Sequence, residues 1–143
     1  MGGLRIFALG LLLIFTPVVQ SCEPTSSHVN TVERFIAAFN AHDSSAMADL
    51  VANDIEWLSI TGEQVTVEAR GKGDLIESMN AYFKSCPTCR SELSGVVSTT
   101  SKVSAVEIVS WQGKSGPRSQ SAISVYELSG GVIIRVYYFS AEK

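Results

Sequence analysis

The sequence contains little cysteine, proline, histidine or basic charge, and each shortage excludes a class of protein. Three cysteines and four prolines in 143 residues exclude a disulfide-dense scaffold and a proline-rich linker. Two histidines and one close cysteine pair do not supply four ligands for zinc, so we expect no metal. The eleven basic residues are scattered and outnumbered by fourteen acidic ones, which argues against a nucleic-acid partner. Neither a Walker motif nor a dinucleotide fingerprint is present, so we expect no cofactor.

Long hydrophobic runs are also missing, with one exception near the N-terminus. Residues 6–15 are almost wholly apolar, follow Arg5, and are fewer than the about 20 residues that span a bilayer. This pattern predicts a signal peptide over residues 1–21, and a membrane anchor helix is the alternative. Val19-Gln20-Ser21-Cys22 resembles a bacterial lipobox, which predicts a lipid on Cys22; ordinary signal-peptidase cleavage at the same bond is the alternative.

We therefore expect an exported, periplasm-facing lipoprotein that is held at the membrane by acyl chains on Cys22. A soluble secreted or periplasmic protein is the alternative. Residues 22–27 would form a polar tether, and residues 28–143 a single domain. The 122 residues from Cys22 onward carry a net charge of −4 and suffice for one core but not for two domains.

Helical periodicity marks the first part of that domain. Val29, Val32, Phe35, Ile36 and Phe39 recur every three or four residues, which predicts a helix with one apolar face. Asn40-Ala41-His42-Asp43 ends this period, and Asp43 can cap a short second helix. A third helix is predicted over residues 74–84. We expect both histidines, His28 and His42, to be solvated rather than catalytic.

Period-two alternation marks the rest of the chain. It predicts six strands, at residues 55–60, 64–70, 90–99, 102–111, 118–128 and 132–139. Short loops join the later strands, so neighbours along the chain are expected to be antiparallel. The order of elements predicts an α+β fold with helices packed on an antiparallel sheet of about six strands.

Cys86 and Cys89 form a C-P-T-C motif with two possible roles. A thioredoxin-type motif needs its first cysteine at the start of a helix, but this pair follows a helical segment. We expect a local structural disulfide, which would contribute about 2 kcal/mol by closing so short a loop.

Four sequence segments together resemble the nuclear-transport-factor-2-like (NTF2-like) superfamily, in its SnoaL-like and ketosteroid-isomerase-like branches. They are Val32-Glu33-Arg34-Phe35-Ile36, Asn40-Ala41-His42-Asp43, Leu50-Val51-Ala52-Asn53-Asp54 and Arg135-Val136-Tyr137-Tyr138-Phe139. The resemblance implies a strongly curved sheet wrapped round a long helix, giving a cone whose mouth holds a small apolar ligand. It also implies a homodimer formed through the outer face of the sheet.

The same resemblance permits a test of chemistry. The tyrosine, the base and the second donor of ketosteroid isomerases fall on Phe35, Ser59 and Ser124 here. None of these side chains can do the work of the group it replaces, because a phenyl ring donates no hydrogen bond and a serine alone takes no proton near neutral pH. This comparison favours a hollow without proton-handling groups.

Alternation in the strands nevertheless nominates residues for a pocket. We expect its lining among Phe35, Phe39, Trp57, Ser59, Tyr82, Trp111, Ser124, Tyr126 and Tyr138; a role in the core is the alternative. Glu107 shares a face with Val103, Ala105 and Val109. It is a candidate acid or base beside Tyr126 if that face points inward, whereas it merely touches water if the face points outward.

The sequence thus favours a non-catalytic domain that binds a small apolar ligand or a protein partner. The alternative is a SnoaL-like lyase, cyclase or isomerase that acts on a small hydrophobic substrate through Glu107.

Overall fold

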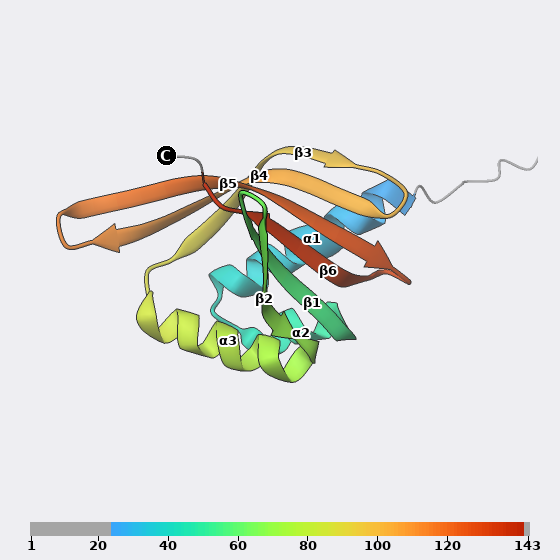
Figure 1. Cartoon of the computed structure of the whole chain (residues 1–143), viewed down its shortest axis with the longest axis horizontal. Coiled ribbons are helices and arrows are strands. Elements are labelled where there is room, and N and C mark those ends of the chain that lie inside the picture. The colour runs from blue at the N-terminus through green and yellow to red at the C-terminus, as the bar shows by residue number, and fades with distance from the viewer. Residues whose placement is uncertain (1–23, 142–143) are drawn as a thin grey trace, which may run out of the picture.

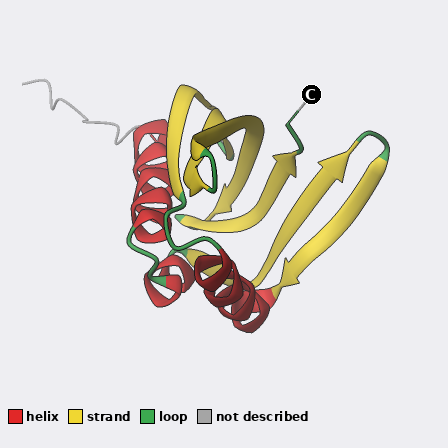
Figure 2. Ribbon diagram, turned by 90° about the vertical axis from the view of Figure 1, so that its left-hand side faces the viewer, coloured by secondary structure: helices red, strands yellow, loops and turns green. Residues whose placement is uncertain are grey.

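Three helices and six strands make up the computed structural model, which describes residues 24–141. The helices are α1 (Pro24–Asn40), α2 (Ser44–Asp49) and α3 (Gly71–Ser85). The strands are β1 (Val51–Thr61), β2 (Gln64–Arg70), β3 (Arg90–Ser98), β4 (Lys102–Gly113), β5 (Gly116–Ser129) and β6 (Val132–Phe139). The α+β fold with six strands that the sequence predicted is confirmed, and Figure 2 shows the sheet curving strongly beside the helices.

The six strands form one sheet in the order β2-β1-β6-β5-β4-β3. Four of the five neighbouring pairs are antiparallel, as expected from the short loops, but β1 and β6 run parallel. The sheet is therefore mixed, and the prediction of a purely antiparallel sheet is wrong on this point. The reason is that α3 and four other strands separate β1 from β6 along the chain, so no hairpin fixes their relative direction.

Helix α1 begins at Pro24, before Val29, the first residue of the predicted apolar face, so residues 24–27 of the expected tether are helical. A proline at a helix start is compatible with the backbone geometry there. The predicted apolar face is buried in the core, with Val32 and Phe35 at 0% and 1% exposure. Phe35 lies against the concave face of the sheet, with its ring centroid 6.1 Å from that of Tyr126.

His42 lies in the turn between α1 and α2. Its φ is 55°, a left-handed value that residues other than glycine seldom adopt. The amides of His42 and Asp43 donate to the carbonyls of Phe39 and Ala38, which is the Schellman pattern for ending a helix. As predicted, the Asp43 side chain caps α2, with Oδ1 accepting from the Ala46 amide at 2.9 Å.

The β4–β5 hairpin extends well beyond the other strands (Figure 1). Its pairing runs without interruption from Lys102 opposite Glu127 to Gly113 opposite Gly116. The inner part of the hairpin packs over α1, and its alternate side chains Val103, Ala105, Glu107 and Val109 are all buried. This face of β4 is the floor on which the candidate site is built.

Candidate functional site

A cavity of about 540 Å³ lies between the concave face of the sheet and helices α1 and α3. Residues from all six strands except β3, together with both helices and the disulfide loop, contribute to its walls. They are Phe39, Trp57, Ser59, Glu68, Ala69, Ser78, Met79, Tyr82, Cys86, Cys89, Glu107, Val109, Trp111, Gln120 and Tyr138. Cavities of this size and mixed character are typical of small-molecule sites.

Glu107 is the buried charged residue of this cavity, at 6% exposure. Ser91 Oγ donates to its Oε1 at 2.6 Å, and the Tyr126 hydroxyl donates to its Oε2 at 2.9 Å. Each carboxylate oxygen of Glu107 thus accepts one hydrogen bond from a hydroxyl group. The alternative in which Glu107 points outward to water is wrong, because its face of β4 is the concave one.

The two donors to Glu107 come from the strands on either side of β4. Ser91 lies on β3 and is buried; Tyr126 lies on β5, at 1% exposure, beneath the cavity. The backbone of Ser91 is held in turn by Asn40 at the end of α1, whose amide donates to the Ser91 carbonyl at 2.8 Å and accepts from the Ser91 amide at 2.7 Å. Glu107 is therefore fixed by contacts that reach from the helix to two strands.

This arrangement overturns one sequence-based interpretation. Phe35, Ser59 and Ser124 do lack the groups of a ketosteroid isomerase, but the hollow is not free of proton-handling side chains, since the Glu107 carboxylate lines it and accepts a hydrogen bond from the Tyr126 hydroxyl beneath it. The pair comes from positions that the family comparison did not test. The sequence feature that indicated it was Glu107, a single acidic residue among apolar residues on one face of β4. That pattern alone does not determine whether this face points into the hollow or to solvent.

Tyrosines around Glu107 are held in their neutral form. Burial, and next the negative charge of Glu107, raise the pKa of Tyr126 well above its usual value. The same two causes, in the same order, raise the pKa of Tyr82 and bring that of Tyr138 to about 12. The hydroxyls of Tyr82 and Tyr138, which line the cavity, are therefore donors near neutral pH.

Six of the nine residues nominated for the pocket line the cavity: Phe39, Trp57, Ser59, Tyr82, Trp111 and Tyr138. Phe35, Ser124 and Tyr126 do not line it. They are almost fully buried below its floor, where they take the core role that was the stated alternative. The difference arises because side chains of the same strand face lie at different depths in a strongly curved sheet.

Several lining residues were missed by the sequence reasoning. Glu68 is the clearest case, because alternation along β2 gives it no special place. Trp57 pairs with Ala69 and Leu58 pairs with Val67, so Glu68 is the extra residue of a β-bulge, which redirects its side chain toward the cavity. Ser78, Met79 and Gln120 were also missed, since their places depend on how α3 and β5 pack.

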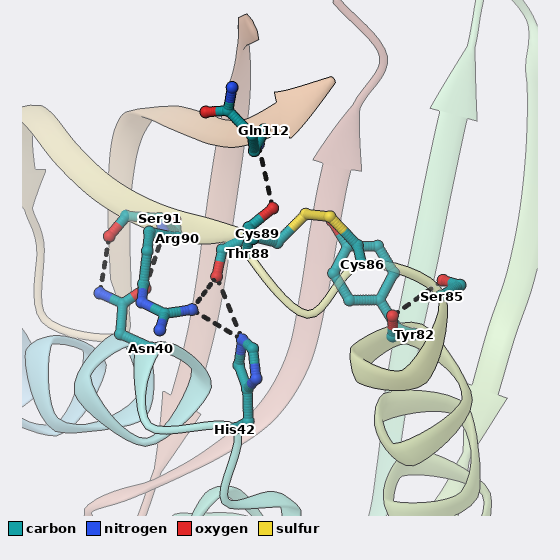
Figure 3. Close-up of a disulfide and its surroundings, with 10 residues drawn as sticks. All are labelled: Asn40, His42, Tyr82, Ser85, Cys86, Thr88, Cys89, Arg90, Ser91 and Gln112. Carbon is teal, nitrogen blue, oxygen red and sulfur yellow. Dashed lines mark hydrogen bonds between the residues drawn. A yellow bond between two sulfur atoms is a disulfide. The ribbon is translucent and has the colours of Figure 1, made fainter. Parts of the chain in front are cut away.

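The expected disulfide joins Cys86 and Cys89 and forms part of the cavity wall (Figure 3). The Tyr82 hydroxyl donates to Cys89 Sγ at 3.4 Å, and Thr88 Oγ1 accepts from the Gln112 amide at 3.0 Å. These contacts attach the loop after α3 to both that helix and β4.

His42 lies next to this loop and is half-buried, so its ring is less exposed to solvent than expected. Its ring stacks on that of Phe83, with 4.5 Å between the ring centroids. Its Nε2 is 3.2 Å from the Cys89 carbonyl oxygen and 2.9 Å from Arg90 Nη1 (Figure 3). His28 is half-buried on α1. Neither ring lines the cavity.

The proposed signal peptide and Cys22 lie outside the described residues. Within residues 24–141, no helix is both long enough and apolar enough to cross a membrane. The same part of the chain contains no group of three or more His, Cys, Asp or Glu side chains placed to hold a metal ion.

Comparison with known proteins gives one family match and many similar folds. Residues 32–136 match the model of the SnoaL-like domain. A cystatin-fold protein of uncharacterised function from Novosphingobium aromaticivorans superposes with a TM-score of 0.69 at 20% identity, covering 79% of this chain and 97% of that one. A protein from Jannaschia, provisionally described as a SnoaL-like polyketide cyclase, gives 0.69 at 12% identity, with coverages of 82% and 87%.

A third protein, from Xanthomonas campestris and provisionally described as a polyketide cyclase, gives a TM-score of 0.60 at 17% identity, with coverages of 82% and 92%. No curated protein matches the chain. Identities this low establish the shared fold and leave the chemistry to be argued from the site itself.

Proposed function

The chain belongs to the SnoaL-like domain family, and we propose that it is a proton-transfer enzyme of the lyase, cyclase or isomerase kind. Its substrate would be a small, largely hydrophobic molecule bound in the cavity, with Glu107 as acid and base. The observation that carries this proposal is the buried Glu107 carboxylate, which lines the cavity and is held by two hydroxyl donors.

Glu107 has the properties that general base catalysis needs. Its carboxylate is fixed in position by Ser91 and Tyr126, and neither donor carries a charge that would neutralise it. It takes a proton from the bound substrate, becomes a carboxylic acid, and returns the proton to another atom of the same molecule.

Tyr82 and Tyr138 supply a complementary function. Negative charge develops on the substrate as a proton is removed, and a neutral hydroxyl within reach stabilises that charge by donating a hydrogen bond. Both tyrosines line the cavity and keep their protons at neutral pH, because burial and Glu107 raise the pKa of each. We propose Tyr138 as a donor to the substrate, and Tyr82 as a second donor once its hydroxyl turns away from Cys89 Sγ, whereas Tyr126 is a positioning residue for Glu107.

The test is proton exchange measured on a panel of small hydrophobic carbonyl compounds in deuterated water. The protein should accelerate deuterium incorporation into at least one of them, as followed by mass spectrometry. Glu107→Gln should lower that rate about 100-fold or more, because the amide cannot accept the proton.

Glu92→Gln is the matched control, since Glu92 lies on neighbouring β3 and is exposed. It should leave the rate unchanged. An equal loss in both variants, or full activity in Glu107→Gln, would contradict the proposed role. Circular dichroism of both variants checks that each remains folded.

A second candidate is a non-catalytic domain that binds a small apolar ligand or a protein partner. It is favoured by Phe35, Ser59 and Ser124, which stand where ketosteroid isomerases carry their catalytic groups. Under this candidate, steroid-like or polyketide-like ligands raise the melting temperature equally in the unchanged protein and in Glu107→Gln, and no compound exchanges protons.

We also propose that the protein is exported and anchored at the membrane by lipid on Cys22. The lipobox-like segment supports this proposal, and so does the Cys86–Cys89 disulfide, since disulfides persist in oxidising compartments outside the cytosol. The mass of membrane-extracted protein should exceed that of the chain from Cys22 by the added acyl groups. Cys22→Ser should abolish that excess.

A further inference from the structure

We infer that the ligand of this cavity carries a positive charge: an organic amine or quaternary ammonium group attached to an apolar body. The inference rests on the proposed function in one respect, since it takes the cavity to be the substrate site. It goes further by naming the substrate class, and it is carried by the charges and rings that line the cavity.

The first observation is an imbalance of charge. Two carboxylates, Glu68 and Glu107, line the cavity, whereas its described lining contains no lysine, arginine or histidine. The ion pairs formed by the described acidic residues involve Glu56 and Glu127 instead. A buried charge in a protein is normally paired with an opposite charge, and Glu107 has hydrogen bonds but no such partner. A cationic ligand would supply it.

The second observation is the number of aromatic rings around the carboxylates. Phe39, Trp57, Tyr82, Trp111 and Tyr138 all line the same cavity. The face of an aromatic ring carries partial negative charge and attracts an organic cation, and tryptophan does so most strongly. Rings of this kind, combined with carboxylates, form the usual site for alkylated ammonium groups.

The two carboxylates reach the cavity from different halves of the sheet. Glu107 lies on β4, near one edge, and Glu68 lies on β2, the strand at the other edge. The bulge at Glu68 is what directs this second carboxylate inward, because regular alternation would not. A ligand in the cavity therefore meets negative charge from both sides.

The negative charge of Glu107 acts on other groups that line the cavity. After burial, it is the next cause that raises the pKa values of Tyr82 and Tyr138. Glu107 therefore opposes the formation of a negative charge on either tyrosine, and it would repel an anionic ligand in the same way. A small metal ion fits poorly as well, since calcium and magnesium need about six or more oxygen ligands and the described residues contain no group of three or more His, Cys, Asp or Glu side chains placed to hold one.

The test compares three probes that share a benzyl group and differ in charge. Benzyltrimethylammonium is the cation, neopentylbenzene its neutral carbon isostere, and phenylacetate the anion. Binding to the purified protein is measured by the change in tryptophan fluorescence, since Trp57 and Trp111 line the cavity. We expect the cation to bind at least about tenfold more tightly than its isostere and the anion not to bind.

Two variants test whether Glu107 and Glu68 cause the preference for the cation over its neutral isostere. Glu107→Gln should remove most of it and Glu68→Gln part of it, while Glu63→Gln, in the exposed turn between β1 and β2, should leave it unchanged. Glu68→Gln keeps the test informative if Glu107→Gln fails to fold, because Glu68 is exposed at the surface end of the cavity. Equal binding of cation and isostere, or a preference that survives in both variants, would overturn the inference.

The experiments distinguish a failure of the cationic-ligand inference from a failure of the proposed enzymatic function. Benzyltrimethylammonium has no acidic nitrogen proton, so its binding does not depend on catalysis. Preference for the cation without any proton exchange would sustain the ligand class and reject the enzyme. Exchange on a neutral substrate without preference for the cation would do the reverse.

Discussion

The position of the Glu107 side chain depends on a few hydrogen bonds from uncharged residues, each of which lies on a different helix or strand. Asn40 holds the backbone of Ser91, Ser91 and Tyr126 donate to Glu107, and no described positive charge takes part. A carboxylate held in this way keeps its negative charge available to a ligand. The cost is that removing any one donor leaves a buried charge partly unsatisfied.

Tyr126→Phe tests this dependence. The substitution removes a buried hydroxyl that donates to Glu107 Oε2 at 2.9 Å and keeps the ring in the core. The expected loss in the free energy of unfolding is about 1–3 kcal/mol, measured by urea denaturation. Tyr137→Phe is the control, because its hydroxyl contacts Glu127 on the partly exposed side of the sheet, and it should cost less. A larger loss in the control would contradict the argument.

The raised pKa of Tyr138 predicts a change in stability at high pH. In the unfolded chain this tyrosine ionises near its usual value of 10.0, whereas in the folded protein it does so near about 12. Below pH 10 both states hold the proton and there is no effect. Between these values the unfolded state binds fewer protons, so stability falls as the pH rises.

Tyr138→Phe should remove that part of the fall. Urea denaturation at several pH values gives the free energy of unfolding for both proteins, and their difference should be flat below pH 10 and change above it. Burial and Glu107, the two largest causes, raise the pKa of Tyr126 in both proteins, so most of its contribution cancels in the comparison. A difference that changes below pH 10 would show that another group is responsible.

At the level of single residues, the sequence located Glu107 but not its direction. Alternation placed it in a row with Val103, Ala105 and Val109, and that row is equally consistent with either face of β4. What settles the direction is the set of donors from β3 and β5, which belong to other strands. Contacts of this kind depend on strand order and register, which local alternation does not contain.

Among the elements, the strands and helices with strong periodicity were predicted well, and their irregularities were not. β2 and β6 have the predicted limits, as the alternation along each is regular. The parallel pairing of β1 with β6 and the bulge at Glu68 were missed, because both arise from how distant segments meet. The bulge matters most, since it adds the second carboxylate to the cavity.

The loop after α3 gives a prediction at this scale. The Cys86–Cys89 disulfide closes a short loop that anchors the end of α3 and forms part of the cavity wall. Replacing both cysteines by serine should lower the free energy of unfolding by about 2 kcal/mol, the value expected for so short a loop. Urea denaturation measures the change.

Dithiothreitol provides the matching control for this prediction. It should lower the stability of the unchanged protein by a similar amount and leave that of the double-serine variant unaffected. Sensitivity of the double variant to the reductant would mean that the disulfide is not the source of the effect.

The outer face of the sheet is a property of the whole molecule. Strand register aligns Val65, Ile60, Phe139, Ile123 and Val106 in one row across five strands. Val65, Phe139, Ile123 and Val106 are exposed, with Ile123 at 55%. A continuous apolar row of this kind on the surface marks an interaction site, and it lies on the side of the sheet away from the cavity.

We propose that a second copy of the chain covers this row, in keeping with the dimer that the superfamily resemblance implies. A twofold interface is self-complementary, and an apolar row crossing the middle strands of the sheet can pack against itself. Sedimentation equilibrium of the purified protein should then give twice the mass of one chain. Ile123→Glu should give the mass of a single chain, because a carboxylate at the centre of the row would be buried without a partner.

Ala81→Glu is the matched control, since it adds the same charge at an exposed position on α3, away from the outer face. It should remain a dimer. If the unchanged protein is a monomer, the apolar row is not a dimer interface. If both variants dissociate, the cause is the added negative charge and not the position of the substitution in the row. Because the row and the cavity lie on opposite faces of the same sheet, Ile123→Glu should bind the cationic probe as the unchanged protein does. In the proposed dimer each subunit would therefore carry its own cavity.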